Sequence, residues 1–231
     1  MTNDTALAAR LAEVHRRIEA ACARSGRAPE TVTLVAVSKT HPPDTVAAAI
    51  TAGVTALGEN RAQEFVPKVL AAREAGLRAE WHFIGHLQRN KVREVLPYVD
   101  VLHSLDSERL IREIVARAPE ARLGHRRLRC FIEVNVAGEQ QKEGVPPEAV
   151  GALLEAARGA EVLDVRGLMT VAPHVSNPQD VRPVFVRLRE LAAEHGLREL
   201  SMGMTDDFEV AIEEGATLVR VGRAIFGDRL G

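Results

Sequence analysis

Apolar positions at the start of the chain recur at steps of three or four residues, which is the spacing of one face of a helix. Between residues 5 and 24 the apolar positions are Leu7, Leu11, Val14, Ile18, Ala21 and Cys22. Arginine and glutamate fill the positions between them, and Ser25 and Gly26 follow at the point where a helix would end. The pattern predicts an amphipathic helix in front of the rest of the chain.

From residue 32 onward the chain repeats one pattern: a short run rich in β-branched residues, a polar or glycine-containing turn, and a segment of helical period. The short runs are residues 32–38, 55–58, 81–85, 100–105, 129–136, 163–169, 198–202 and 217–222. The helical segments between them are residues 44–53, 62–76, 88–98, 107–118, 147–159, 183–196 and 206–215. Strict alternation of this kind predicts parallel strands joined by crossover helices.

Eight strand–helix units favour an α/β fold of the closed (β/α)8 TIM-type barrel, with an open doubly wound sheet as the alternative. A barrel of this type commonly uses about 250 residues for one domain, and the chain has 231. No linker rich in glycine, serine or proline divides it. We therefore expect a single domain over residues 1–231, with the extra N-terminal helix within 1–26 and the barrel over 30–231.

Charge and cysteine content argue against several classes of protein. Thirty lysines and arginines oppose thirty-two aspartates and glutamates, so the basic excess of a nucleic-acid-binding protein is missing. Cys22 and Cys130 lie far apart in no metal-binding spacing and are expected to be reduced thiols. The N-terminal segment is too charged for a secretion signal, and no apolar run approaches the ~20 residues of a membrane span. We expect a cytoplasmic protein without a nucleic-acid or membrane partner.

Lys39 is the first candidate for chemistry, because active sites of barrels gather at the carboxyl ends of the strands. It follows Ser38 at the end of an otherwise apolar run. A lysine partly removed from water has a depressed pKa and a nucleophilic amine, which suits Schiff-base formation. The alternative is a solvated lysine at a strand end, and position alone does not choose between the two.

The seventh and eighth turns carry the chemistry of a phosphate site. Barrels often bind phosphate with backbone N–H groups of these two loops and a short helix after them. Gly203 and Gly222 permit a close backbone approach, Ser201 offers a hydroxyl, and Arg223 opens a segment that predicts a short helix. The alternative for each glycine is a tight turn without a ligand, but two matching turns favour phosphate. Before the last crossover helix, Asp206 and Asp207 are expected to form its N-cap.

Eight segments together resemble one known family, the pyridoxal phosphate homeostasis proteins (the YggS/PROSC family). They are LVAVSKT, LGENRAQEF, WHFIGHLQRNK, HSLDS, EVNVAGEQQKEG, GLMTVAP, LSMGMTDDFEVAI and TLVRVGRAIFG, which run from residue 34 to 227. Each segment alone is only suggestive, whereas the set in this order is specific.

The resemblance implies a barrel like the N-terminal domain of alanine racemase, with pyridoxal 5'-phosphate (PLP) held as a Schiff base on Lys39. It implies that Ser201 and the backbone of Gly222 and Arg223 bind the cofactor phosphate. Arg223 stands where a small hydroxyl residue is common in the family, which leaves a contact from its side chain open.

Three further residues are implied as neighbours of the cofactor ring. Arg220 is expected to face the pyridine nitrogen, and Asn60 to border the ring. His82 is a weaker candidate for the same shell, because a buried histidine inside a strand is more often structural. Thr205 departs from the family's usual serine but keeps the hydroxyl.

The resemblance predicts a non-catalytic protein of intracellular PLP (vitamin B6) homeostasis, which buffers PLP or delivers it to PLP-dependent apoenzymes. A cation at the pyridine nitrogen makes the ring a poorer electron sink. Alanine racemases take a second base, a tyrosine, from another domain, whereas the only tyrosine here is Tyr98. We expect a monomer, because the additional domain of alanine racemases, which the resemblance does not include, also forms their dimer interface. The alternatives are a PLP-dependent amino-acid racemase or related enzyme, and a cofactor-free barrel that acts on a phosphorylated metabolite.

Overall fold

The computed structural model describes residues 3–121, 126–139 and 141–227, and its strands form one closed, all-parallel barrel in the order β1 to β8. The strands are β1 Thr33–Val37, β2 Ala56–Glu59, β3 Glu80–Phe83, β4 Val101–Leu105, β5 Leu128–Glu133, β6 Leu163–Met169, β7 Glu199–Met204 and β8 Leu218–Val221. Pairing of β1 with β8, with Val35 opposite Arg220, closes the barrel. The (β/α)8 prediction is therefore confirmed, and the open sheet is excluded.

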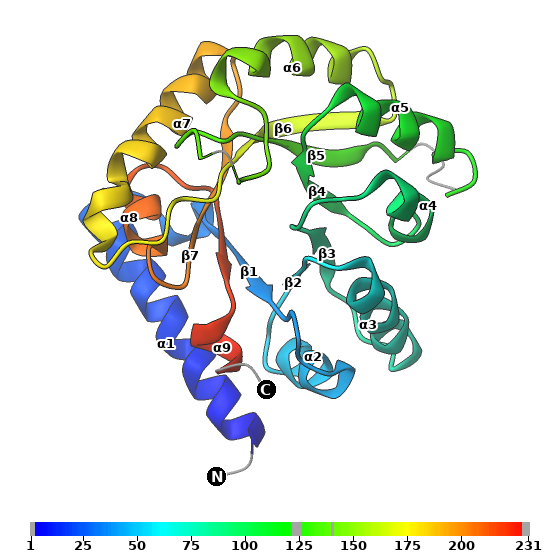
Figure 1. The fold of residues 1–231 in the computed structure, drawn as a ribbon. Helices are drawn as coiled ribbons and strands as arrows, with labels where there is room; N and C mark the ends of the chain where they lie inside the picture. Colours follow the sequence, from blue (N-terminus) through cyan, green and yellow to red (C-terminus); the bar gives the residue numbers. More distant parts are fainter. Residues whose placement is uncertain (1–2, 122–125, 140, 228–231) are drawn as a thin grey trace.

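Helices surround the barrel and connect successive strands (Figure 1). They are α2 Pro43–Thr51, α3 Ala62–Glu74, α4 Val92–Val95, α5 Glu108–Arg117, α6 Val150–Arg158, α7 Arg182–Glu194, α8 Phe208–Glu213 and the short α9 Arg223–Phe226, with 3-10 turns at Pro29–Thr31, Arg89–Lys91, Pro147–Ala149 and Pro178–Val181. The segment expected to be helical over 88–98 is only a 3-10 turn followed by one turn of α4, ahead of Pro97. No helix of the described chain is long and apolar enough to cross a membrane.

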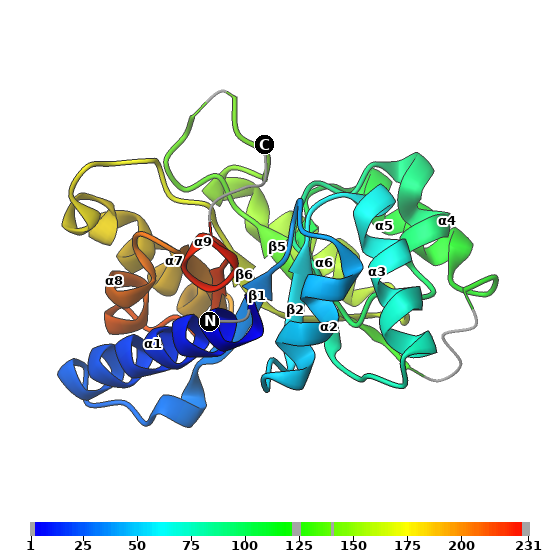
Figure 2. The ribbon, with the colours of Figure 1, turned by 90° about the horizontal axis from the view of Figure 1, so that it is seen from below.

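The N-terminal helix, α1 (Asn3–Arg24), packs along α8 and α9 outside the barrel, as Figures 1 and 2 show. Its apolar face is buried, and its polar face is tied to the last unit of the barrel. Arg10 Nε donates to the carbonyl of Ile225 at 2.6 Å, and Arg17 Nε donates to Glu209 at 2.8 Å. The predicted extra helix therefore exists, and it braces the segment that carries the eighth turn.

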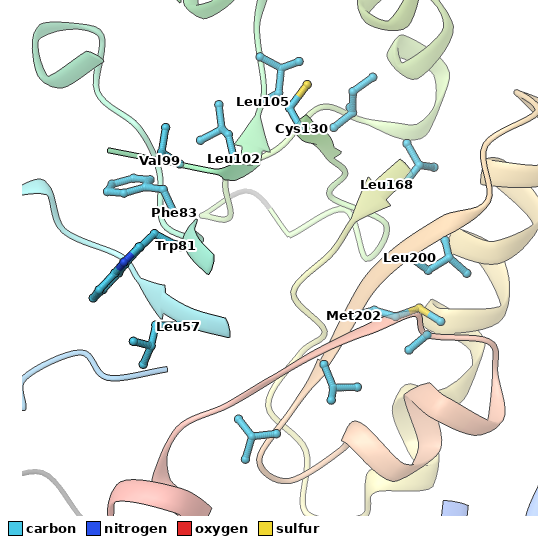
Figure 3. Close-up of a cluster of buried hydrophobic side chains, with 14 of the residues drawn as sticks. Leu57, Trp81, Phe83, Val99, Leu102, Leu105, Cys130, Leu168, Leu200 and Met202 are labelled. Atoms are coloured by element: carbon cyan, nitrogen blue, oxygen red, sulfur yellow. The ribbon is translucent and has the colours of Figure 1, made fainter. Parts of the chain in front are cut away.

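The buried side chains form two layers, one outside and one inside the barrel. Figure 3 shows part of the outer layer, which lies between strands and helices and includes Leu57, Trp81, Phe83, Val99, Leu102, Leu105, Cys130, Leu168, Leu200 and Met202. The inner layer is Val35, Ala56, Val101, Phe131, Met169 and Leu218. Because strand side chains alternate between faces, His103 and Arg220, each two residues after an inner-layer residue, also point inward. The interior thus combines an apolar layer with inward-pointing polar side chains.

Gly167 provides a test of this packing. It lies in β6 at a shift of register against β5, and a Cβ atom there would come within 1.7 Å of the Glu199 carbonyl oxygen. We expect Gly167→Ala to lower the free energy of unfolding by about 3 kcal/mol or more, because backbone must move to admit the methyl group. Urea unfolding measures this change.

Gly159 is the matched control. A Cβ there would make only an ordinary contact of 3.5 Å with the Ala156 carbonyl oxygen, and the backbone is right-handed helical. We expect Gly159→Ala to be neutral or to stabilise by about 0.5 kcal/mol. Equal effects of the two substitutions would contradict the close approach of β6 to β7.

Candidate functional site

A cavity of about 450 Å³ opens at the carboxyl ends of β1, β7 and β8, and it has the size of a pocket for a small ligand. Four of the predicted site residues line it: Lys39, Arg220, Gly222 and Arg223. The remaining lining residues are Val37, His41, Ile84, Met204, Thr205, Asp206 and Gly227. Its polar side chains are thus those of Lys39, Arg220 and Arg223, the Asp206 carboxylate, the His41 ring and the Thr205 hydroxyl.

Lys39 lies in a constrained turn two residues past β1 and is half-buried. The next residue, Thr40, has a φ of 69°, and among the described residues it is the only non-glycine with a positive φ. A left-handed threonine costs on the order of 1 kcal/mol or more. The Thr40 N–H donates to Glu64 Oε2 at 2.6 Å, which holds the turn in this conformation.

A buried ion pair supports the same turn from below. Lys68, on α3, donates to the Ser38 carbonyl at 2.8 Å and to Glu59 Oε1 at 2.5 Å, and Ser38 Oγ donates to the same Glu59 oxygen at 2.7 Å. Burial raises the pKa of Glu59, while the Lys68 ammonium opposes that rise. The pair therefore holds the backbone next to Lys39 in place. The Lys68 amine is itself occupied by these hydrogen bonds.

The chain has only four lysines, which makes the assignment of a nucleophile sharp. Lys68 is 3% exposed and bonded to Glu59. Lys91 pairs with Glu94 at 2.9 Å on the surface, and Lys142 pairs with Glu139 at 2.5 Å. Lys39 alone among the four lines the cavity.

The two glycine turns predicted to bind phosphate have different roles. Gly222 borders the cavity, where its N–H points at Thr205 Oγ1 at 3.4 Å, and a Cβ on it would lie 3.1 Å from the Val37 carbonyl oxygen. Gly203 has a φ of +91°, and a Cβ there would lie 2.6 Å from Ala211 Cβ, so it serves the packing of α8. Close approach explains the first glycine, and a left-handed backbone explains the second.

The structure does not bring Ser201 to the cavity, contrary to the expected phosphate contact. Ser201 lies inside the barrel on β7 with no exposed surface, and its Oγ is bonded to Arg220 Nη1 at 2.6 Å and to His103 Nδ1 at 2.8 Å. Its position in mid-strand places it below the ligand level. The hydroxyl at the cavity is that of Thr205, one residue past β7, and the strand-end rule applied to Thr205 would have found it.

Arg220 forms the floor of the cavity and is 4% exposed. Its guanidinium donates to two neutral oxygens, Ser201 Oγ at 2.6 Å and the Thr170 carbonyl at 2.8 Å. Burial lowers the pKa of Arg220 to about 10, so it remains a cation at neutral pH. The Arg223 guanidinium instead pairs with Asp206 at 2.6 Å at the rim, which leaves its backbone as the part suited to the ligand.

His82 and Asn60 lie elsewhere than at the Lys39 cavity. His82 has no exposed surface and points inside the barrel, where it contacts His103 Nε2 at 2.8 Å and Glu80 Oε2 at 2.8 Å. Asn60 lines a neighbouring cavity beside Gly85, and its buried Oδ1 has no partner among the described residues. Neither residue therefore lines the Lys39 cavity.

Two details near the site differ from expectation or gave no signal in the sequence. Asp207 stands at the N-cap position of α8, but its side chain accepts from the Met204 N–H at 2.5 Å and makes no capping bond to the helix.

His41 lines the cavity with its ring 5.2 Å from that of Phe226. Burial lowers the pKa of His41, which favours the neutral ring.

Glu133, the last residue of β5, is a buried acid inside the cavity end of the barrel. Burial raises its pKa to about 7; Arg220 opposes this rise, while Asp106 and Glu143 add to it. Nothing in the alternation of its strand distinguished it from a solvated acid. Its charge state therefore changes near neutral pH.

Comparison with known proteins places the whole chain beside proteins of one kind. The family model for the alanine racemase N-terminal domain matches residues 10–230. The pyridoxal phosphate homeostasis protein of Aquifex aeolicus is 46% identical over 226 residues, which cover 95% of this chain and 97% of that protein. The protein of the same name from Pseudomonas aeruginosa is 41% identical over 225 residues, with 96% of each chain covered.

A solved structure is also similar to this chain over its full length. PipY of Synechococcus elongatus PCC7942, with PLP bound, is 34% identical and superposes with a TM-score of 0.81, covering 96% of this chain and all of that one. The similarity therefore extends over sequence and fold together.

The raised pKa of Glu133 predicts a pH-dependent stability. Because its folded pKa lies above the ordinary value of 4.5, Glu133 contributes stability below that pH, and this contribution is lost as the pH rises through about 7. Glu133→Gln removes the loss. We expect the variant to gain about 2 to 3 kcal/mol relative to the parent chain between pH 5 and pH 8, measured by urea unfolding. Exposed Glu148→Gln is the control, and an equal gain there would contradict the assignment.

Proposed function

Because the chain belongs to the pyridoxal phosphate homeostasis protein family, we propose that it binds PLP in the Lys39 cavity and serves PLP homeostasis without catalysing a reaction of its own. The observation that carries the proposal is the position of Lys39. It is the only one of the four lysines in the cavity, and the same cavity holds Arg220 and the Thr205–Gly222 turn.

The residues present fit a phosphorylated pyridine aldehyde. The Thr205 hydroxyl and the close-approach position at Gly222 suit a phosphate group, in place of the buried Ser201. The cations Lys39 and Arg220 complement its negative charge. Asn60, with a buried Oδ1 that lacks a described partner, is the residue suited to border the ring from the adjoining cavity.

PLP, when bound, supplies an aldehyde that condenses reversibly with an amine and a pyridine ring that can accept electrons. The Lys39 amine would hold the cofactor through that aldehyde, and hydrolysis would free the amine again. The Lys68–Glu59 pair and the Glu64 contact hold the turn in one position for this role. Lys39 thus acts as a reversible covalent tether.

Two features support storage rather than catalysis. Arg220 remains a cation at the floor of the cavity, and a cation beside the pyridine nitrogen disfavours ring protonation and so weakens the electron sink. The only tyrosine, Tyr98, lies just before β4 with Arg73 packed over its ring. That is the amino end of the barrel, opposite the cavity. A protein of this design would release PLP to apoenzymes by hydrolysis of the tether.

We expect Lys39→Ala to abolish the visible absorption band that appears when PLP is added to the purified chain. In the parent protein, borohydride reduction and peptide mapping should place the adduct on Lys39. Lys91→Ala is the matched control, because Lys91 lies on the surface in a pair with Glu94, and its band should be unchanged.

Two results would overturn the proposal. Adducts spread over Lys68, Lys91 and Lys142 would remove the special role of Lys39. Turnover of an amino acid by the purified protein, lost in Lys39→Ala, would establish an enzyme instead of a carrier.

The Thr205 hydroxyl is expected to contribute to phosphate binding. Thr205→Val keeps the shape of the side chain and removes the hydroxyl, so PLP affinity should fall about tenfold, the value of one hydrogen bond to a charged group. Thr205→Ser should retain the parent affinity. Titration with pyridoxal, which lacks the phosphate, is the control; an equal loss for both ligands would mean that Thr205 acts on the fold instead.

A further inference from the structure

A chain of hydrogen bonds runs through the barrel interior from the cavity floor to the opposite end. Arg220 Nη1 bonds to Ser201 Oγ at 2.6 Å, Ser201 Oγ to His103 Nδ1 at 2.8 Å, and His103 Nε2 to His82 Nδ1 at 2.8 Å. The last bond joins His82 Nε2 to Glu80 Oε2 at 2.8 Å. Four strands contribute: β3, β4, β7 and β8.

The hydrogen-bond chain begins at buried side chains inside the barrel and ends at a side chain near the surface. Ser201, His82 and His103 have no exposed surface. Glu80, at the start of β3, has a side chain that is 35% exposed and receives an ion pair from Arg129 at 2.5 Å. The chain therefore connects the cavity at the carboxyl ends of the strands with a charged pair at their amino ends.

The two ends give the chain one direction. Arg220 only donates, so Ser201 must accept from it and send its own proton to His103 Nδ1. His103 then carries its proton on Nε2 and donates to His82 Nδ1. His82 in turn carries its proton on Nε2 and donates to the Glu80 carboxylate, whose pKa is lowered to about 2, first by the His82 hydrogen bond and also by that from Arg129. Burial holds the pKa of His103 well below its ordinary value, consistent with a neutral ring.

The reverse direction leaves a group unsatisfied. If His103 carried its proton on Nδ1, Ser201 Oγ would face two donors, and its hydroxyl proton would have no acceptor among its two described partners. A buried hydroxyl without an acceptor is costly. One arrangement therefore satisfies every proton in the chain.

We propose that Glu80, His82 and His103 are positioning residues that act through Ser201 to hold the Arg220 guanidinium at the cavity floor, facing the pyridine nitrogen of the bound ligand. The inference rests on the proposed PLP site. Because the acidic end of the hydrogen-bond chain is two histidines away, Arg220 is oriented without a carboxylate bonded to it, and Glu133 and Asp207 act on its charge only through space.

The first test needs neither a variant nor a ligand. Two-dimensional 15N NMR of the histidine rings of the full-length protein should find a bare Nδ1 and a proton on Nε2 in both His103 and His82. A proton on Nδ1 of His103, or exchange between tautomers, would overturn the directed chain.

The second test separates positioning from folding. We expect His103→Phe and Ser201→Ala each to weaken PLP binding about tenfold, with the double variant no weaker than the stronger single one, since both break the same connection. A PLP analogue with carbon in place of the ring nitrogen should bind the parent protein and all three variants with equal affinity. If the losses of affinity were additive, or if the analogue lost as much affinity as PLP, the hydrogen-bond chain would serve only the stability of the fold.

Glu80 supplies the matched pair. Glu80→Gln keeps an acceptor for His82 and should keep the tautomers and the affinity within about twofold, whereas Glu80→Leu removes the acceptor and should cause the larger loss. Equal behaviour of the two variants would contradict the proposal. If the parent protein bound no PLP at all, the proposed function would be wrong. The NMR result would still decide the direction of the hydrogen bonds.

Discussion

The buried guanidinium of Arg220 is the constraint on which the site depends. A cation that is 4% exposed must be satisfied inside the barrel, and here it is satisfied by a serine hydroxyl and a carbonyl oxygen instead of a carboxylate. Ser201 and His103 are buried with it for that reason. The same arrangement leaves Arg220 lining the cavity, where under the proposed function it would oppose protonation of the pyridine ring.

The opposite wall of the cavity depends on a second buried charge system. Lys68 and Glu59 are both almost fully buried, and Lys68 and Ser38 Oγ both donate to Glu59 Oε1. Lys68 also donates to the Ser38 carbonyl, whereas Glu59 Oε2 has no partner among the described residues. Glu64 holds the left-handed Thr40. Lys39 therefore projects from a turn that three side chains determine, and a lysine in a fixed position meets an aldehyde more readily than a mobile one.

One cavity brings together Lys39, the Thr205–Gly222 turn and Arg220, and the proposed storage of PLP rests on that arrangement. Under the proposed function, Lys39 would bind PLP reversibly, and the Arg220 cation would weaken the electron sink that catalysis on an amino acid needs. Membership of the pyridoxal phosphate homeostasis family agrees with that use. The acid Glu133, with a pKa of about 7, makes the charge of the cavity end sensitive to pH near neutrality.

The sequence by itself determined the fold and the main contacts of the candidate site. Short runs rich in β-branched residues, alternating with helical segments, predicted all eight strands within a few residues, and strand ends located Lys39 and Gly222. These signals are local, since each depends on neighbouring positions along the chain. The depth of a side chain in the barrel is not local. Ser201 in the seventh run and Thr205 shortly after it are only four residues apart, yet Ser201 is bonded to Arg220 inside the barrel and Thr205 lines the cavity. Likewise, only the tertiary structure could bring Lys68 to Ser38 and join His82 to His103, because these contacts connect different strands and helices whose relative stagger no single segment encodes.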